Sequence, residues 1–288
     1  MKPPRGAALL ALMLTVPGCT ADAGEDIRFV RIPVGKAVVS LREDATPAPV
    51  SSAIWLHLHG ATETVEQQFA RIGAPGVLVT LTLPGLSKVY ADHFAEEGVW
   101  GRMLRDVSEV VRLHGGGPGW EPGPLTVSSF SAGFGGVRQL LRQPEAFERI
   151  NALVMADSIY CGYSGPATER RVDPELMAGF VRFARLAAQG KRRMLVTHSA
   201  QIPDGYASTT ETADFLVAAV GGLRVEASDA WRDGLRATGR FARDGLEVVG
   251  FAGGEAKDHL QHLRSLGLFW ERLRSPSPAS DAGATTGR

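Results

Sequence analysis

Ser131 lies where an apolar strand pattern runs into small residues and then into a helix pattern, within LTVSSFSAGFGG at residues 125–136. In a strand, turn and helix unit of this kind, the serine hydroxyl stands free at the carboxyl edge of a sheet. The backbone N–H of the next residue, Ala132, and the helix N-terminus then face any oxyanion that forms beside the hydroxyl. This arrangement suits acyl transfer by a nucleophilic serine.

The residues around Ser131 only partly match a nucleophile elbow of the G-x-S-x-G type. Such an elbow needs small side chains two residues before and after the serine, because strand and helix nearly touch there. Gly133 meets that need, and Ser129 stands where the pattern has its first glycine. An ordinary Ser/Gly-rich strand-to-helix loop is the alternative, since short motifs recur by chance.

Three further polar side chains follow predicted strands. His59 closes the apolar run at residues 54–58, and Asp157 closes the run at residues 151–156. His259 follows the strand predicted at 246–251 and a glycine-rich loop. A serine, a carboxylate and an imidazole therefore occur in this order along the chain, each at the end of a strand.

On these residues the chain resembles the α/β-hydrolase superfamily, over about residues 50 to 272. The resemblance implies an α/β fold with a mostly parallel central sheet and helices on both faces. The alternation of strand and helix patterns along the chain agrees with that architecture, which gathers active-site groups at the carboxyl ends of the strands.

The resemblance also implies roles for the site residues. Ser131 is the expected nucleophile, His259 the base and Asp157 the acid of a catalytic triad. Backbone N–H groups of Ala61 and Ala132 are the expected oxyanion hole. The expected reaction is cleavage of a carboxylic ester through an acyl-enzyme intermediate, with a small-molecule or polymer-linked ester as substrate. A serine peptidase of the same fold, and a hydrolase-fold lipoprotein that binds without catalysis, are the alternatives.

Asp204 is the alternative to Asp157 as the acid of the triad. It follows the penultimate predicted strand, where the commoner hydrolase plan places the carboxylate. Asp204 lies in Pro-Asp-Gly, and turn chemistry fully explains an aspartate there. Asp157 closes an apolar run, where an ionised group needs a partner to offset its desolvation. Asp157 is therefore preferred as the acid.

A metal site is a minor alternative for the histidines of this region. His57 and His59 alternate along one strand and are expected to share a face, and His198 and Asp157 are candidates to converge on them. The residues after His59 are Gly-Ala-Thr-Glu-Thr and supply no closely spaced Asp or His ligands. We therefore expect no metal and no cofactor, and a role for His57 or His59 in orienting the oxyanion loop.

The composition of the chain limits the other classes of function that it can have. The chain has 288 residues, of which 44% are hydrophobic, and this is enough for one large core in a single domain. Its 31 basic and 31 acidic residues cancel without a Lys/Arg-rich run, so nucleic-acid binding is not expected. Cys161 is expected to be a small buried filler rather than a nucleophile.

The first residues resemble a targeting signal. Residues 1–18 combine a basic start with an apolar stretch too short to span a bilayer, and VPGC at residues 16–19 resembles a bacterial lipoprotein processing site. The expected product carries lipid on Cys19 and is an exported lipoprotein, anchored to a membrane and facing the periplasm or the cell exterior. A plain secretory peptide is the alternative. Residues 19–26 are predicted as a tether, 27–274 as the hydrolase domain and 275–288 as a disordered tail.

Several elements that position these residues are predicted from periodicity. A hairpin is expected from strands at 27–32 and 36–41, and a helix with a clear apolar face at 174–188. The other predicted strands lie at residues 53–58, 76–82 and 193–197, and the other predicted helices at 63–72 and 101–113.

Overall fold

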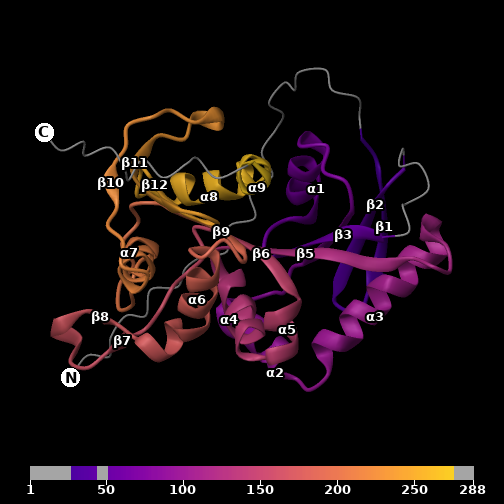
Figure 1. Cartoon of the computed structure of the whole chain (residues 1–288), viewed down its shortest axis with the longest axis horizontal. Helices are drawn as coiled ribbons and strands as arrows, with labels where there is room; N and C mark the ends of the chain where they lie inside the picture. The colour runs from indigo at the N-terminus through magenta and orange to yellow at the C-terminus, as the bar shows by residue number, and fades with distance from the viewer. Residues whose placement is uncertain (1–26, 44–50, 276–288) are drawn as a thin grey trace, which may run out of the picture.

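A ten-stranded sheet forms the centre of the computed structural model, which describes residues 27–43 and 51–275. The strand order is β1-β2-β4-β3-β5-β6-β9-β12-β11-β10 (Figure 1). The strands are β1 Phe29–Val34, β2 Ala37–Arg42, β3 Ser51–Leu58, β4 Val77–Leu81, β5 Glu121–Phe130, β6 Ile150–Ala156, β9 Arg193–His198, β10 Val225–Glu226, β11 Ala237–Arg243 and β12 Leu246–Phe251.

The middle of the sheet is parallel and its two ends are antiparallel. Neighbouring strands from β4 through β3, β5, β6 and β9 to β12 run parallel. The β1–β2, β2–β4, β12–β11 and β11–β10 pairs run antiparallel. After β3 the chain goes to one side to form β4 and then returns to the other side to form β5. In open α/β sheets ligands bind beyond the carboxyl ends of the strands at such a reversal, here those of β3 and β5.

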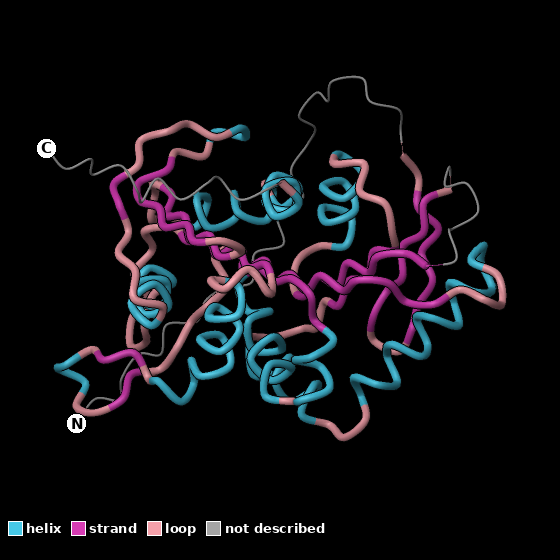
Figure 2. The backbone as a smooth tube through the Cα atoms, viewed as in Figure 1, coloured by secondary structure: helices cyan, strands magenta, loops and turns pink. Residues whose placement is uncertain are grey.

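Helices cover both faces of the sheet, as the cyan and magenta layers of Figure 2 show. One face carries α1, α8 and α9, and the other carries α2 to α7 (Figure 1). The helices are α1 Thr62–Arg71, α2 Ser87–Ala95, α3 Val99–Val111, α4 Phe134–Arg142, α5 Pro144–Arg149, α6 Pro174–Ala187, α7 Thr209–Ala219, α8 Ala256–Arg264 and α9 Leu266–Arg274.

Each face of the sheet has its own apolar core. One cluster joins the sheet to α2–α7 and includes Tyr90, Phe94 and Phe180; the other joins it to α1, α8 and α9 and includes Trp270 and Phe269. The parallel strands are buried on both sides, so their sequences are continuous apolar runs instead of alternating patterns. The predicted fold class, a mostly parallel sheet with helices on both faces, is confirmed.

The predicted hairpin and the helix at 174–188 are confirmed with small shifts of their ends. The hairpin is β1–β2, with Gly35 at its turn in a left-handed conformation that glycine adopts easily. Helix α6 begins where Asp173 accepts hydrogen bonds from the N–H groups of Glu175 and Leu176 and where Pro174 stands at the first helical position. Before α6 the chain forms a two-stranded ribbon, β7 Tyr163–Ser164 and β8 Arg171–Val172.

Some sequence-based statements fall outside the described residues. These are the signal segment at 1–18, Cys19, the tether at 19–26 and nearly all of the predicted tail. In the part of the chain that the structure does describe, no helix combines the length and the apolar character needed to cross a bilayer.

Candidate active site

The turn that holds Ser131 is sharp and tightly packed. Ser131 follows β5 directly and has φ 46°, a left-handed conformation that is strained for a residue with a Cβ. Residues Ser131–Gly133 form a short 3₁₀ turn that leads into α4. A Cβ at Gly133 would lie 2.3 Å from the carbonyl oxygen of Leu58, so only glycine fits where the turn meets the end of β3.

Ser129, which departs from the expected glycine, has a defined role in this turn. Its side chain is fully buried, and its hydroxyl lies 2.8 Å from the hydroxyl of Ser158. The Ser158 hydroxyl also donates to the carbonyl oxygen of Ser131, at 2.9 Å. A chain of two hydroxyls therefore ties the turn after β6 to the turn that carries Ser131.

Ser158→Ala should lower kcat for a simple ester up to about tenfold, because it removes the hydroxyl that links the Ser131 carbonyl to the Ser129 hydroxyl. Losing a buried hydrogen bond costs about 0.5–1.5 kcal/mol, and a rise of about 1.4 kcal/mol in the barrier lowers a rate tenfold. Steady-state kinetics and urea unfolding measure the two effects. Ser108→Ala is the matched control: Ser108 is buried and donates to Leu104 within α3, away from this turn. Equal kcat values for the two variants would contradict the role given to Ser158.

Asp157 and His259 meet at the carboxyl end of the sheet. Asp157 is fully buried just after β6, and its Oδ2 lies 2.7 Å from His259 Nδ1. Its Oδ1 accepts the N–H of Ser199 at 3.0 Å and the hydroxyl of Thr209 at 2.5 Å. Every contact of this carboxylate supplies a hydrogen-bond donor, which is the arrangement that stabilises its ionised form.

The charge state of Asp157 follows from this environment. Burial by itself raises the pKa of the carboxyl, but the hydrogen bonds from His259 and Thr209 and the nearby imidazoles outweigh burial and hold the pKa well below its usual value. An ionised Asp157 accepts from Nδ1–H of His259. The other ring nitrogen, Nε2, is then free to accept a proton.

Asp204, the rival acid, is exposed in the loop between β9 and α7. The hydrogen bonds of His259 in the described chain include none to Asp204, whereas Asp157 bonds its Nδ1 directly. Of the two carboxylates weighed from sequence, the structure brings Asp157 to the imidazole.

His259 lies in the first turn of α8 and stacks on Phe130. Their ring centroids are 4.5 Å apart at an interplanar angle of 29°, and Phe130 directly precedes Ser131. Asp258 accepts the N–H of Glu255 at 2.9 Å, so it caps the helix and does not bind the His259 ring. Among the described residues Ser131 Oγ makes no hydrogen bond, and such nucleophile–base contacts often close only when substrate binds.

His57 and His59 occupy different places, contrary to the expected shared face. The His57 ring packs edge-on against Trp270 of α9, at 6.2 Å between centroids. His59 Nδ1 lies 2.9 Å from the hydroxyl of Tyr90 in α2, on the opposite side of the sheet. The alternation of β3 ends at His59 because its backbone turns to φ 72°.

His57, one of the two histidines predicted to orient the loop after β3, contacts that loop directly. His57 Nε2 lies 2.9 Å from the carbonyl oxygen of His59, and its Nδ1 lies 2.9 Å from the hydroxyl of Ser128. Thr82 donates to the carbonyl oxygen of Gly60. With both carbonyls held, the loop ends at Ala61, the N-cap of α1.

The two residues predicted for the oxyanion hole lie on neighbouring loops. Ala61 precedes α1 after β3, and Ala132 follows Ser131 after β5. Strands β3 and β5 pair in register, with Leu58 opposite Ser129, so the loops leave the sheet side by side. Backbone N–H groups at two such loop-to-helix starts are the kind of donors that hold an oxyanion.

The three candidate triad residues each follow a strand of the sheet and occur in the expected order along the chain. Ser131 follows β5, Asp157 follows the neighbouring strand β6, and His259 follows β12, with all three at the carboxyl edge. Their order along the chain is that of the nucleophile, acid and base in the superfamily named above. The chain has the α/β-hydrolase fold.

Comparison with known proteins gives similarities of structure alone. No protein-family model and no curated protein matches the sequence. Similar solved structures include EstE1, a thermostable carboxylesterase cloned from a metagenomic library, at 14% identity over 88% of this chain and 90% of that chain, with a TM-score of 0.46. TT1662 from Thermus thermophilus is 18% identical over 86% and 98%, with a TM-score of 0.41. A putative carboxylesterase from Lactobacillus plantarum is 14% identical over 86% and 93%, also with a TM-score of 0.41. With TM-scores below 0.5, these similarities say nothing of the reaction.

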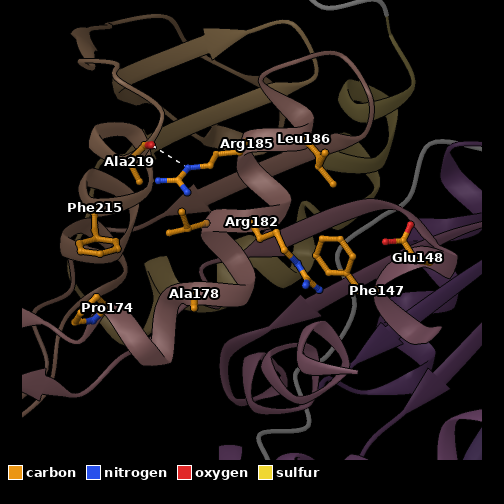
Figure 3. Close-up of a pocket in the computed structure, with 10 residues that line it drawn as sticks. Phe147, Glu148, Pro174, Ala178, Arg182, Arg185, Leu186, Phe215 and Ala219 are labelled. Atoms are coloured by element: carbon orange, nitrogen blue, oxygen red, sulfur yellow. Dashed lines mark hydrogen bonds between the residues drawn. The ribbon is translucent and has the colours of Figure 1, made fainter. Parts of the chain in front are cut away.

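One cavity, of about 700 Å³, lies between α5, α6 and α7 and includes none of the candidate residues (Figure 3). Its two arginines are engaged: Arg182 covers the Phe147 ring and donates to Leu141, and Arg185 donates to the carbonyl of Ala219. The second, of about 450 Å³, contains His198 but neither Ser131 nor His259. Neither cavity competes with the Ser131 turn as a site of chemistry.

His198 does not join His57 and His59. Its Nδ1 lies 3.0 Å from the Thr210 hydroxyl, and its Nε2 contacts the guanidinium of Arg224. Within residues 27–43 and 51–275, no group of three or more His, Cys, Asp and Glu side chains is placed to hold a metal ion. Cys161 is buried and unpaired with another cysteine, and burial raises the pKa of its thiol, which fits a small packing residue.

Residues that support Asp157 were not found from sequence. Ser199 and Thr209 supply its donors, and both come from segments on which no prediction was made. The one available signal was the Ser208-x-x-Glu211 pattern, a capping box that starts α7 and sets Thr209 at its first position.

Proposed function

We propose that this chain is a serine hydrolase that cleaves a carboxylic ester through an acyl-enzyme intermediate. The observation that carries the proposal is the buried Asp157–His259 pair, whose imidazole stacks on the residue directly before Ser131. Fixing an imidazole with a buried carboxylate beside a strained serine is the arrangement that activates a hydroxyl for attack.

The first half of the proposed reaction forms the acyl-enzyme. His259 Nε2 takes the proton of the Ser131 hydroxyl as Oγ attacks the ester carbonyl carbon. Asp157 holds the Nδ1 proton and stabilises the imidazolium cation. When the tetrahedral intermediate collapses, the C–O bond to the alcohol breaks, and the alcohol leaves with the proton from Nε2.

The second half repeats these steps with water. His259 takes a proton from water as the water oxygen attacks the acyl carbon, and the proton passes to Ser131 Oγ when the acid leaves. In both halves the N–H groups of Ala61 and Ala132 hold the oxyanion. Donors of this kind typically change rates by about a hundredfold or more.

A fluorophosphonate probe tests the proposal directly. We expect one phosphonyl adduct per chain, at Ser131, because only an activated hydroxyl displaces fluoride from the probe at a useful rate. Tandem mass spectrometry must place the adduct, since Ser128 and Ser129 are near it in sequence.

Two variants complete the labelling experiment. Ser131→Ala should lose the adduct, and His259→Ala should label far more slowly, whereas Ser108→Ala should label like the parent chain. Absence of labelling in the parent chain would favour a protein that binds without catalysis, and labelling that persists in Ser131→Ala would exclude Ser131 as the nucleophile.

We also propose that the chain is exported and held at a membrane, facing the periplasm or the cell exterior, by lipid on Cys19. The support is the basic start, the short apolar stretch and the VPGC sequence at residues 16–19. Cys19→Ser should move the protein from the membrane fraction to the soluble exported fraction. Recovery of this variant in the membrane fraction at the parent level would contradict the anchor.

A further inference from the structure

Three aromatic rings form a continuous surface beside His259, which we name the aromatic wall: Phe134, Tyr160 and Tyr206. The Tyr160 ring meets the His259 ring edge-on, with centroids 6.5 Å apart at 70°. Tyr160 in turn contacts Tyr206 at 5.7 Å and Phe134 at 5.6 Å. Phe134 is the first residue of α4, after β5, and Tyr160 and Tyr206 lie in the segments after β6 and β9, all at the carboxyl edge of the sheet.

The aromatic wall leads from the buried site to solvent. Phe134 is 8% exposed and Tyr160 is half-buried, whereas Tyr206 is 41% exposed. The wall therefore offers an exposed ring, Tyr206, that is connected through Tyr160 to the imidazole of His259.

The wall is held in place before any ligand arrives. The N–H of Ala207 donates to the carbonyl of Cys161 at 2.8 Å, so the residues that follow the two tyrosines are paired through their backbones. Arg138 contacts the carbonyl oxygen of Tyr160, and its guanidinium lies 4.8 Å from the centre of the Phe134 ring. A surface fixed in this way loses little freedom when it binds.

The position of the wall decides which part of an ester it meets. Asp157 occupies Nδ1 of His259, so the proton for the departing alcohol must come from Nε2. The alcohol oxygen therefore lies at His259 when the tetrahedral intermediate collapses. Groups beside the imidazole, on its Tyr160 side, then contact the alcohol part of the substrate.

We propose that the aromatic wall binds the alcohol part of the ester, and that this alcohol carries a ring with an apolar face, as aromatic alcohols and sugars do. Rings of this shape stack on exposed tyrosines with a gain beyond simple burial. This inference rests on the proposed ester hydrolysis, and it adds the side of the ester on which selectivity lies.

The experiment compares benzyl acetate with ethyl acetate, two acetates of primary alcohols that differ in the ring. For the parent chain we expect a higher kcat/KM for benzyl acetate. Tyr206→Ala should lower the benzyl-to-ethyl ratio of kcat/KM about two- to tenfold, mainly through KM, since the ring against which the benzyl group stacks is removed. Tyr206→Phe keeps the ring and should keep the ratio. Leu113→Ala, at an exposed apolar residue that follows α3 and lies outside the wall, should change kcat/KM for neither substrate.

Two further substrates separate the alternatives. Ethyl phenylacetate carries its ring on the acyl side, and its ratio to ethyl acetate should not depend on Tyr206. A 6-O-acetyl glucoside, compared with benzyl acetate, shows whether a sugar or an aromatic alcohol gains more from the wall, and a Tyr206-dependent gain for either supports the proposal.

The contradicting outcomes are distinct. A Tyr206→Ala effect confined to ethyl phenylacetate would place the wall on the acyl side, and an equal effect on all esters would make Tyr206 merely structural; both overturn the proposal while leaving the hydrolase intact. If the parent chain neither reacted with fluorophosphonate nor cleaved any of these esters, the proposed ester hydrolysis would be wrong. The proposed role of the aromatic wall, which depends on it, would then be wrong as well.

Discussion

Ser131→Ala should lower kcat for a short acyl nitrophenyl ester by about ten-thousandfold or more. The substitution removes the only atom that forms the acyl bond in the proposed reaction, and losses of this size follow when a nucleophile of such a triad is removed. The expected residual rate is that of water attack helped by the oxyanion donors. Steady-state hydrolysis, followed at saturating ester, measures the loss.

A double variant makes this prediction specific to a cooperating triad. If Ser131 and His259 act as one unit, His259→Ala should cost nearly as much as Ser131→Ala, and the two together should cost little more than either alone. Urea unfolding of each variant checks that the fold persists. A parent-like kcat in Ser131→Ala would rule out the mechanism, and additive losses would separate the two residues.

At this site, the sequence allowed us to predict the polar side chains that follow the ends of strands. Asp157 and His259 were singled out because each follows an apolar run, and in a parallel sheet such ends meet at one edge. Their contact, at 2.7 Å, needs nothing beyond that topology. Ser158, Ser199 and Thr209 were missed, because their roles depend on contacts between segments that are far apart in sequence, and only Thr209 lies beside a recognisable motif, the capping box that starts α7.

Among the elements, those with strong apolar runs were predicted and those without were not. Helix α2, SKVYADHFA, buries Tyr90 and Phe94 and has only a weak apolar face, so its pattern did not stand out. Strand β11 contains Gly239 and two arginines and is recognised only through its antiparallel pairing with β12. In both cases tertiary contacts override a weak local signal.

Backbone strain marks the same edge of the sheet. Of the six non-glycine residues with positive φ in the described chain, three directly follow the parallel strands β3, β5 and β6: His59, Ser131 and Asp157. Such conformations cost about 1–3 kcal/mol each and persist where surrounding contacts fix them. Here the contacts are those of the proposed oxyanion loop, nucleophile and acid, so the strain coincides with the groups that need exact placement.

Acid should unfold this protein at mildly acidic pH, because it buries three neutral imidazoles. His57, His198 and His262 are 1%, 4% and 1% exposed. Burial lowers the pKa of His57 to about 3 and that of His198 and His262 to about 4, and for His198 the charge of Arg224 adds to the effect. In the unfolded chain each imidazole titrates near its usual pKa of about 6.5.

The sign follows from the protons bound by the two states. Between about pH 6.5 and 4 the unfolded chain binds more protons, so the free energy of unfolding falls as pH falls. Each fully shifted histidine contributes about 1.4 kcal/mol per pH unit, and three together approach about 4 kcal/mol per pH unit. For a stability of about 5–10 kcal/mol near neutral pH, this slope brings the free energy of unfolding to zero between about pH 5.5 and 4. Asp157, whose folded pKa is lowered, adds a loss only below its unfolded pKa, near pH 4.

Urea unfolding followed by circular dichroism from pH 7.5 to 5.5 measures the slope, and two variants assign it. His262→Asn should flatten the slope by about 1.4 kcal/mol per pH unit, because it removes one buried imidazole. Thr197→Val is the matched control: it removes the 2.9 Å hydrogen bond between Thr197 and His262 Nδ1 but leaves the ring buried. It should lower stability at every pH and leave the slope steep. If His262→Asn left the pH dependence of the free energy of unfolding unchanged, the His262 ring would already be accessible to water in the folded protein. Burial of this imidazole would then not be the source of the acid sensitivity.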